Sequence, residues 1–243
     1  MLGIDGASLL DVWESGAGSS NPARAHALLA RAGAWSDGFG LGERDARLLE
    51  LRRRTFGEEL RAFVACPECG QKLEIVSSVS DVTFEPCEPD VRGGRAFSAT
   101  IDGYEVSGRT PTVADVSAAA RCADVASARA ELVRRCVTDA TDGAGAVPAE
   151  DLPAGVLEAV GEVIADADPQ AEIRLRLACA ACGHGWRASL DIAQFLWSEV
   201  AAAGRRVLDE VVTLAAAYGW SEAEILSLSP WRRRTYVDGV AGG

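Results

Sequence analysis

Two matching cysteine motifs, "CPECG" at 66–70 and "CAACG" at 179–183, constrain this chain more than any other feature. In a Cys-x-x-Cys-Gly knuckle, the backbone turns tightly enough for both sulfur atoms to reach one ion at about 2.3 Å. The glycine relieves the strain just after the second ligand. Two knuckles supply the four thiolates of a tetrahedral site. The predicted metal ligands are therefore Cys66, Cys69, Cys179 and Cys182.

The residues around the knuckles favour β-structure. A strand is predicted after the first knuckle at 72–76, another before the second at 172–178, and a third after it at 186–190. This is the layout of a zinc ribbon whose two halves are separated by a long insertion. Two alternatives remain: a pair of independent redox motifs, each of which should be followed by a helix, and a rubredoxin-type iron site with the same four ligands.

A site with four thiolates has no open position for water or substrate, so we predict one structural zinc ion. His184, two residues after Cys182, is interpreted with Trp186 as part of a β-hairpin and not as a ligand. The other cysteines, Cys87, Cys122 and Cys136, lack paired spacing. Each is interpreted as a small, buried or partly buried residue.

The rest of the chain is predicted to be mainly helical. Two short helices are expected within residues 1–35, and two more, broken near Gly57, before the first knuckle. The insertion is expected to hold a hairpin turning at Asp102-Gly103, helices near 112–120, 124–137 and 155–167, and a loop at 141–155. The steps of three and four between apolar residues after 191 predict a long amphipathic helix, with a helical hairpin and a short terminal helix.

The predicted fold class is α+β, mainly helical, with a small split zinc-ribbon sheet that carries a large insertion and is followed by a C-terminal helical hairpin. The expected organisation has four parts. They are an N-terminal helical region at 1–64, the split ribbon at 65–80 and 171–190, an α/β insertion at 81–170, and a C-terminal helical region at 191–243.

Charge and composition exclude several classes of function. The 36 acidic and 24 basic side chains give a formal net charge of -12, which opposes general binding to nucleic acid. The N-terminus has no signal-peptide pattern and no window is apolar enough for a membrane span, so we expect a cytoplasmic protein with reduced thiols. No nucleophile elbow, P-loop, metalloprotease motif or dinucleotide fingerprint occurs, which predicts a non-enzymatic protein.

Aromatic and arginine side chains near the C-terminus are candidates for partner binding. Trp220 and Trp231 flank a predicted short helix, and the arginine run at 232–234 follows Trp231. Both residue types are enriched at binding hot spots. Protein contact is favoured over phosphate binding for this run. The candidate residues are Trp220, Trp231, Arg232, Arg233 and Arg234.

The order of several segments resembles the zinc-ribbon-containing members of the baseplate hub assembly chaperone family of T-even contractile phage tails and phage-tail-like contractile injection systems. The resembling segments are "RDARLLELRRRTFG", "CPECGQKLEI", "GRTPTVADVSAAA" with "ELVRRCV", "DPQAEIRLRLACAACGHGW", and "FLWSEV" with "LAAAYGWSEAEILSLSPWRRRTYVDGV". The resemblance implies a non-enzymatic assembly chaperone or structural component of a baseplate. Its partners would be baseplate or tail-hub proteins, and it could become part of an assembled particle.

Two functions of other classes are alternatives to this one. The first is a zinc-ribbon nucleic-acid-binding or regulatory protein that acts in transcription or processing, which is opposed by the net charge and by the lack of a basic, aromatic strand face. A thiol redox protein would require one cysteine pair to oxidise reversibly without loss of the fold.

Overall fold

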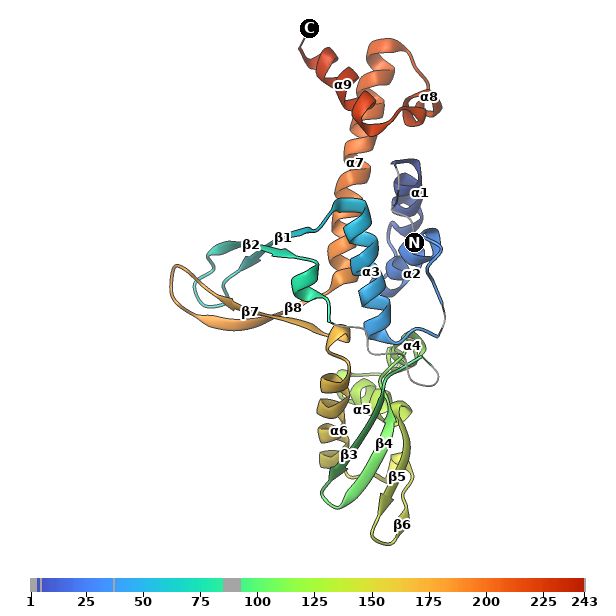
Figure 1. Ribbon diagram of the computed structural model, residues 1–243, viewed down its shortest axis with the longest axis vertical. Helices are drawn as coiled ribbons and strands as arrows, with labels where there is room; N and C mark the ends of the chain where they lie inside the picture. Colours follow the sequence, from blue (N-terminus) through green and yellow to red (C-terminus); the bar gives the residue numbers. More distant parts are fainter. Residues whose placement is uncertain (1–3, 5, 37, 85–92, 243) are drawn as a thin grey trace. The chain divides into compact units, whose positions relative to one another are not determined.

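The computed structural model describes residue 4 and residues 6–36, 38–84 and 93–242 of the 243-residue chain (Figure 1). Its elements form two compact units. The first contains Met1–Trp35, Leu51–Gly57 and Ile192–Gly243, and the second contains Ser36–Glu50 and Glu58–Asp191. Helix α3 (Leu41–Phe56) therefore contributes its beginning to the second unit and its end to the first. The model confirms the predicted α+β class.

The first unit is helical. It contains α1 (Gly6–Gly16), α2 (Asn21–Arg31), the end of α3, α7 (Ile192–Tyr218), α8 (Glu222–Ser227) and α9 (Pro230–Ala241). The predicted apolar stripe of α7 is buried at Leu196, Val200, Ala203, Val207, Val211 and Leu214, but its last predicted member, Tyr218, is 45% exposed. Helices α1, α2 and α9 contact α7. None of the helices in the described part of the chain combines the length and apolar character that a bilayer crossing requires.

A buried ion pair joins α3 to α7 within this unit. The Arg52 side chain, which is 4% exposed, donates two hydrogen bonds to Glu199, at 2.9 and 2.7 Å, and one to the Gly57 carbonyl at 2.7 Å. Arg52, the first residue of the arginine run at 52–54, is thus buried in the fold. Bidentate geometry of this kind is the strongest form of arginine–carboxylate contact.

The C-terminal end of the unit is a small cluster of its own. Ser221 and Glu224 form the capping box that starts α8, and Ser229 caps α9. Val211, Leu214 and Ile225 are buried there, with half-buried Trp220 and Tyr236 packed against them. The long helix, the short α8 and the terminal α9 confirm the predicted C-terminal helical region.

The second unit has a four-stranded sheet with one face covered by helices. Strands β3 (Ala96–Ile101), β4 (Tyr104–Arg109), β5 (Val137–Asp142) and β6 (Gly145–Ala146) are antiparallel and lie in that order. The β3–β4 turn places Asp102 at φ 49° and Gly103 at φ 87°, the conformation expected of an Asp-Gly hairpin turn. Strand β5 starts at the last residue of the helix predicted at 124–137 and runs into the loop predicted at 141–155, which also contains the whole of β6.

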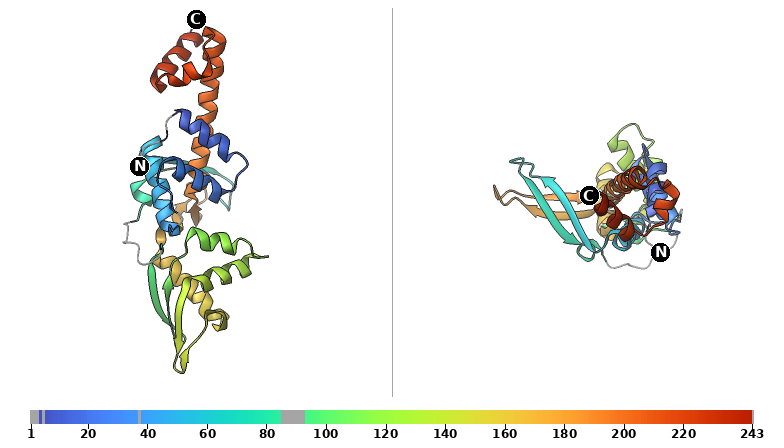
Figure 2. Two further views of the ribbon diagram at one scale, coloured as in Figure 1. Left: turned by 90° about the vertical axis from the view of Figure 1, so that its right-hand side faces the viewer. Right: turned by 90° about the horizontal axis from the view of Figure 1, so that it is seen from above.

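Helices α5 (Val125–Cys136) and α6 (Ala154–Ala167) pack on this sheet (Figure 2). The core between them contains Phe97, Val106, Val133, Val156 and Val160. Short 3-10 turns occur among the described residues of the unit at Ser80–Val82, Ala149–Asp151 and Pro169–Ala171. This core belongs to the second unit alone and does not include the cysteine motifs.

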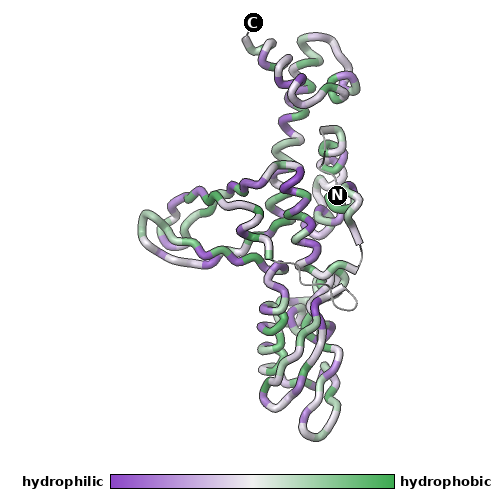
Figure 3. The backbone as a smooth tube through the Cα atoms, in the orientation of Figure 1, coloured by the Kyte–Doolittle hydropathy of each residue, from purple (hydrophilic) through white to green (hydrophobic). Residues whose placement is uncertain are grey.

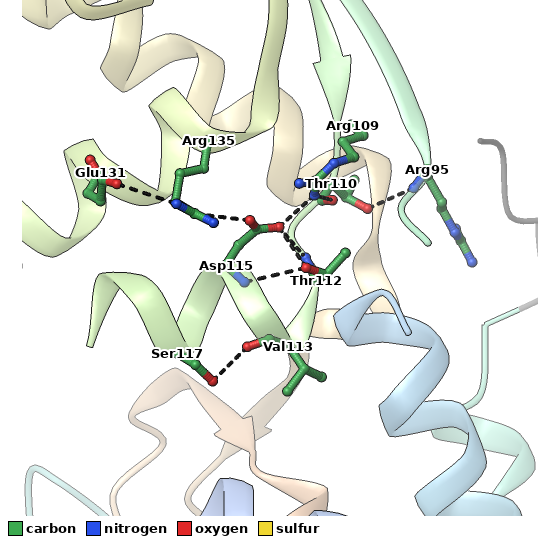
Figure 4. Close-up of polar contacts among 9 residues, drawn as sticks. All are labelled: Arg95, Arg109, Thr110, Thr112, Val113, Asp115, Ser117, Glu131 and Arg135. Carbon is green, nitrogen blue, oxygen red and sulfur yellow. Dashed lines mark hydrogen bonds and ion pairs between the residues drawn. The ribbon is translucent and has the colours of Figure 1, made fainter. Parts of the chain in front are cut away.

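A buried carboxylate at the start of α4 (Val113–Ala119) ties two helices to the sheet (Figure 4). Asp115, whose side chain is 3% exposed, accepts hydrogen bonds from Arg109 at 2.6 Å and Arg135 at 3.1 Å. It also accepts from the backbone N–H and hydroxyl of Thr112, which completes a capping box. Burial alone would raise the pKa of Asp115, but these donors hold it well below its usual range.

Two separate β-hairpins complete the second unit. One contains β1 (Glu59–Ala65) and β2 (Lys72–Ser78), and the other contains β7 (Ile173–Ala178) and β8 (Gly185–Leu190). The hairpins lie side by side (Figures 1 and 2). Hydrophobic and hydrophilic residues alternate along their strands (Figure 3), and the less exposed positions follow the same alternation.

The prediction of a second helix after Gly57 was wrong, because residues 59–65 form strand β1. The three-residue spacing of Leu60 and Phe63 suggested that both face a core. In the strand they lie on opposite faces: Leu60 is buried and Phe63 is 74% exposed. Leu60, Ala62 and Val64 alternate with exposed residues, and β1 pairs with β2 along its whole length. This pairing partner decided the conformation.

Candidate metal centre

Each cysteine motif lies at the tip of one hairpin, and the two motifs have the same backbone hydrogen bonds. The Cys66 N–H donates to the Gln71 carbonyl at 2.9 Å, and the Cys179 N–H donates to the His184 carbonyl at 2.9 Å. The glycine N–H groups donate back to the first cysteine of each motif, at 2.9 Å in one and 2.8 Å in the other. Two sequence-distant segments thus form the same knuckle.

The glycines that end the motifs have a left-handed backbone. Gly70 has φ 72° and Gly183 has φ 73°, and a side chain at either position would be strained. This conformation turns the chain from the second cysteine into the returning strand. It explains why both motifs read Cys-x-x-Cys-Gly.

The four sulfur atoms converge at one point. The Sγ atoms of Cys66, Cys69, Cys179 and Cys182 all lie within 4.8 Å of one another. The first cysteine of each knuckle faces the second of the other, with 3.7 Å between Cys66 and Cys182 and 3.7 Å between Cys69 and Cys179. A tetrahedral ion with bonds of about 2.3 Å requires sulfur atoms about 3.8 Å apart. A disulfide would require about 2.05 Å. The spacing therefore fits a shared ion.

Exposure is divided equally between the knuckles. Cys66 and Cys179 are each 2% exposed, whereas Cys69 and Cys182 are exposed. An ion held here would have protein on one side and solvent near the other. The inner thiols would anchor it to the two hairpins, and the outer thiols would close the tetrahedron.

The close approach of the thiols shifts the pKa values of Cys179 and Cys69 in opposite directions. The N–H groups of Cys182 and Ala181 lower the pKa of Cys179 to about 7. The Gln71 N–H favours the Cys69 thiolate, yet hydrogen bonds with the Cys182, Cys179 and Cys66 thiols raise the pKa of Cys69 to about 12. A divalent cation would favour the thiolate forms in spite of this crowding, because each thiolate would neutralise part of the cation's charge.

The neighbouring side chains add no further ligand to the cluster. His184 stacks on Trp186 with 6.0 Å between the ring centroids, in agreement with its interpretation as a hairpin residue. Within the described residues, the group of close metal-ligating atoms consists of the four cysteines. Four thiolates fill a tetrahedral shell, so the arrangement is suited to holding a fold and offers no open coordination position.

The other cysteines do not join this cluster. Cys136 is fully buried, and burial raises the pKa of its thiol to about 12. Cys122 is half-buried. Both fit their interpretation as small packing residues. Cys87 lies outside the described residues.

The candidate partner-binding residues have different surroundings. Trp220 stacks on Tyr218 at 4.7 Å and contacts Tyr236 edge to face at 5.1 Å, so much of its ring packs inside the C-terminal cluster. Trp231 is 74% exposed at the start of α9. Of the pair, Trp231 offers the larger apolar surface to another molecule.

The arginine run is divided in the same way. Arg233 is buried, donates to Glu210 at 2.8 Å and to the Leu228 carbonyl at 2.8 Å, and so anchors α9 on α7. Arg232 is exposed, as is Arg234, whose side chain is 72% exposed and lies 3.9 Å from Glu210. Sequence spacing alone did not distinguish the inward residue from its neighbours.

Comparison with protein families gives a match over most of the chain. The model of a family described as T4 bacteriophage base plate protein matches residues 36–197. The matched range contains both cysteine motifs and ends within α7. No curated protein and no solved structure matches the chain.

Proposed function

This chain belongs to the family of T4 bacteriophage base plate proteins, and from that premise we propose that it is a non-enzymatic assembly chaperone or structural component of the baseplate of a contractile phage-tail-like particle. The match over residues 36–197 carries this proposal. The resemblance to baseplate hub assembly chaperones adds the finer role. The fold alone would not justify it, because one fold can serve many functions.

The second part of the proposal is one structural zinc ion held by Cys66, Cys69, Cys179 and Cys182. The convergence of four thiols within 4.8 Å in two matching knuckles supports it. Zinc forms closed structural sites with four thiolates, although iron accepts the same ligands. The ion would make the two hairpins one zinc ribbon and link the end of α3 to the start of α7 through them.

The proposed partners are other baseplate or tail-hub proteins, met in the cytoplasm during assembly. A structural component would then stay in the finished particle, and a chaperone would leave it. Trp231, Arg232 and Arg234 are the proposed contact residues, because exposed tryptophan and arginine give large contact energies at interfaces. Trp220 and Arg233 would support them from within the fold.

We predict that the full-length chain, co-expressed with tube, sheath and baseplate proteins of its own particle, co-purifies with at least one baseplate protein. Replacing Trp231 and Arg232 by alanine should weaken that complex by at least about tenfold, the loss typical of a hot-spot residue. Val125→Ala is the matched control, because Val125 is 85% exposed in the other unit. Isothermal titration calorimetry with the purified partner would measure the affinity of the double variant and that of the control.

Failure of the wild-type chain to bind any of these proteins would contradict the proposal. A salt-dependent shift of DNA or RNA by the chain would instead support the nucleic-acid-binding alternative. Immunoblotting of purified mature particles separates the two roles proposed here, since only a structural component remains in them.

A further inference from the structure

A groove in the helical unit is lined by four segments that are distant in the sequence. It has a volume of about 420 Å³ and is lined by residues around α1, the end of α3, the middle of α7 and the segment from α8 to α9. All of these segments belong to the first unit. Its main apolar residues are Leu9, Phe56, Val207, Leu226, Leu228 and Pro230. We call it the arginine groove, after the basic residues described next.

The groove is positively charged in a chain whose net charge is -12. Arg206, Arg233 and Arg234 line it together with one carboxylate, Glu210. Arg233 takes one oxygen of Glu210 at 2.8 Å, which leaves Arg234 at 3.9 Å from the other. Among the residues that the structure describes, no carboxylate lies within 4.0 Å of Arg206. At the edge of this apolar surface, the charge of Arg234 is therefore only weakly neutralised by Glu210. The charge of Arg206 is not neutralised by any described carboxylate within 4.0 Å.

This combination selects one kind of occupant. Apolar side chains of a partner would bury the half-exposed leucines and Phe56, and carboxylates beside them would form charge-assisted, bidentate pairs with Arg206 and Arg234. A basic segment would meet like charges, which disfavours it. An amphipathic helix whose apolar face is flanked by acidic residues satisfies both requirements, as in other cases of a helix bound in a groove.

We infer that the arginine groove is the docking site for an acidic, amphipathic helical segment of a partner protein. This inference rests on the proposed function for the partner's class, a baseplate protein, and it adds where the partner binds and what chemistry its segment has. The anchoring Arg233–Glu210 pair holds α9 against α7 and so shapes one wall of the site. Arg206 and Arg234 form the ion pairs with the acidic side chains of that segment.

The test uses the full chain and a defined peptide. The probe is a fluorescein-labelled helical 14-residue peptide with leucine at every third or fourth position and glutamate beside the leucines. Two comparison peptides replace every glutamate by lysine or every leucine by alanine. We expect the leucine–glutamate peptide to bind and each comparison peptide to bind at least about tenfold more weakly in fluorescence anisotropy. Binding should weaken between low and high salt, because the pairs are near the surface.

The chain offers a charge-matched control for the decisive variant. R206E/R234E reverses the two groove arginines and should weaken peptide binding by at least about tenfold. R121E/R205E makes the same charge change at two exposed arginines that do not line the groove, and should change binding by less than about threefold. Circular dichroism checks that both variants keep their helices.

Equal binding of the glutamate and lysine peptides, or equal losses in the two double variants, would overturn the inference. So would a dimer of the wild-type chain that R206E/R234E converts to monomers in sedimentation, since a second copy would then fill the groove. If R206E/R234E still co-purifies with baseplate proteins as the wild type does, the docking site is wrong and the proposed function stands. If the wild type binds none of them, the proposed function fails whatever the peptides do.

Discussion

Removing the metal that we propose at the four-cysteine cluster is expected to release the hairpins β1–β2 and β7–β8 while the helices stay folded. An isolated two-stranded hairpin is marginally stable in water, and each of these hairpins is a separate two-stranded sheet. Structural zinc contributes an apparent binding free energy of about 10–16 kcal/mol in small zinc domains, so its loss removes the main link between the hairpin tips. The sheet beneath α5 and α6 keeps its own core.

Hydrogen exchange read by mass spectrometry would measure this effect. Amide protection should fall at 59–78 and 173–190 after treatment with a zinc chelator, and metal analysis before it should find one zinc ion per chain. Cys69→Ser should reproduce the loss. Cys122→Ser is the control, because Cys122 is a half-buried cysteine outside the cluster.

Three results would contradict the zinc assignment. Unchanged exchange after complete metal removal would show that the hairpins do not depend on an ion. Iron in the purified protein would favour the rubredoxin-type alternative. Reversible oxidation of one cysteine pair with the fold intact would favour the redox alternative.

Replacing Asp115 by alanine is expected to lower the free energy of unfolding of the second unit by about 3–5 kcal/mol, because it leaves a buried, charged network without its acceptor. Arg109, Arg135 and the start of α4 all lose a partner in this single change (Figure 4). Native-state hydrogen exchange at the buried amides of β4 reports on this unit alone. Asp115→Asn keeps the shape and part of the hydrogen bonding, so it should cost less.

Asp124→Ala is the matched control. Asp124 also caps a helix, accepting from the Ser127 N–H at 2.8 Å, but it is exposed. Losing this exposed cap should therefore cost much less than losing the buried Asp115. Equal effects of the two substitutions would show that burial and the arginines add nothing to Asp115.

The Asp115 contribution should also depend on pH in a defined direction. Its pKa is held below the ordinary value of 3.8 in the folded chain, so the folded state favours the carboxylate more than the unfolded state does. The contribution of Asp115 to the unfolding free energy is fully present above the pKa that this carboxyl has in the unfolded chain. It is lost as the pH falls below about 4. The difference in unfolding free energy between the wild type and Asp115→Asn should therefore shrink on acidification from pH 7 to about 3.

Several parts of the fold could be predicted because their signals lie within a few residues. The Asp102-Gly103 turn, the capping box from Ser221 to Glu224 and the stripe of α7 each depend on local backbone preference or on a short period. The two cysteine motifs were the longest-range prediction that the structure supports. The coordination chemistry of a Cys-x-x-Cys-Gly knuckle is local, and two half-sites need each other.

Other features depended on partners that no local pattern identifies. Residues 59–65 fit a helical period as long as Phe63 is counted as buried, and only the pairing of β1 with β2 turns that side chain outward. Strand β5 likewise forms because β4 lies beside it.

The sequence by itself determined the knuckles, the helical character of both ends and the acidic, mainly helical class, because each follows from residue type at short spacing. Only the tertiary structure decided which member of the run 232–234 is buried and which segments meet in the arginine groove. These depend on packing between elements far apart in the chain. Burial of one arginine against Glu210 and exposure of its neighbours are properties of that packing and not of the three identical side chains.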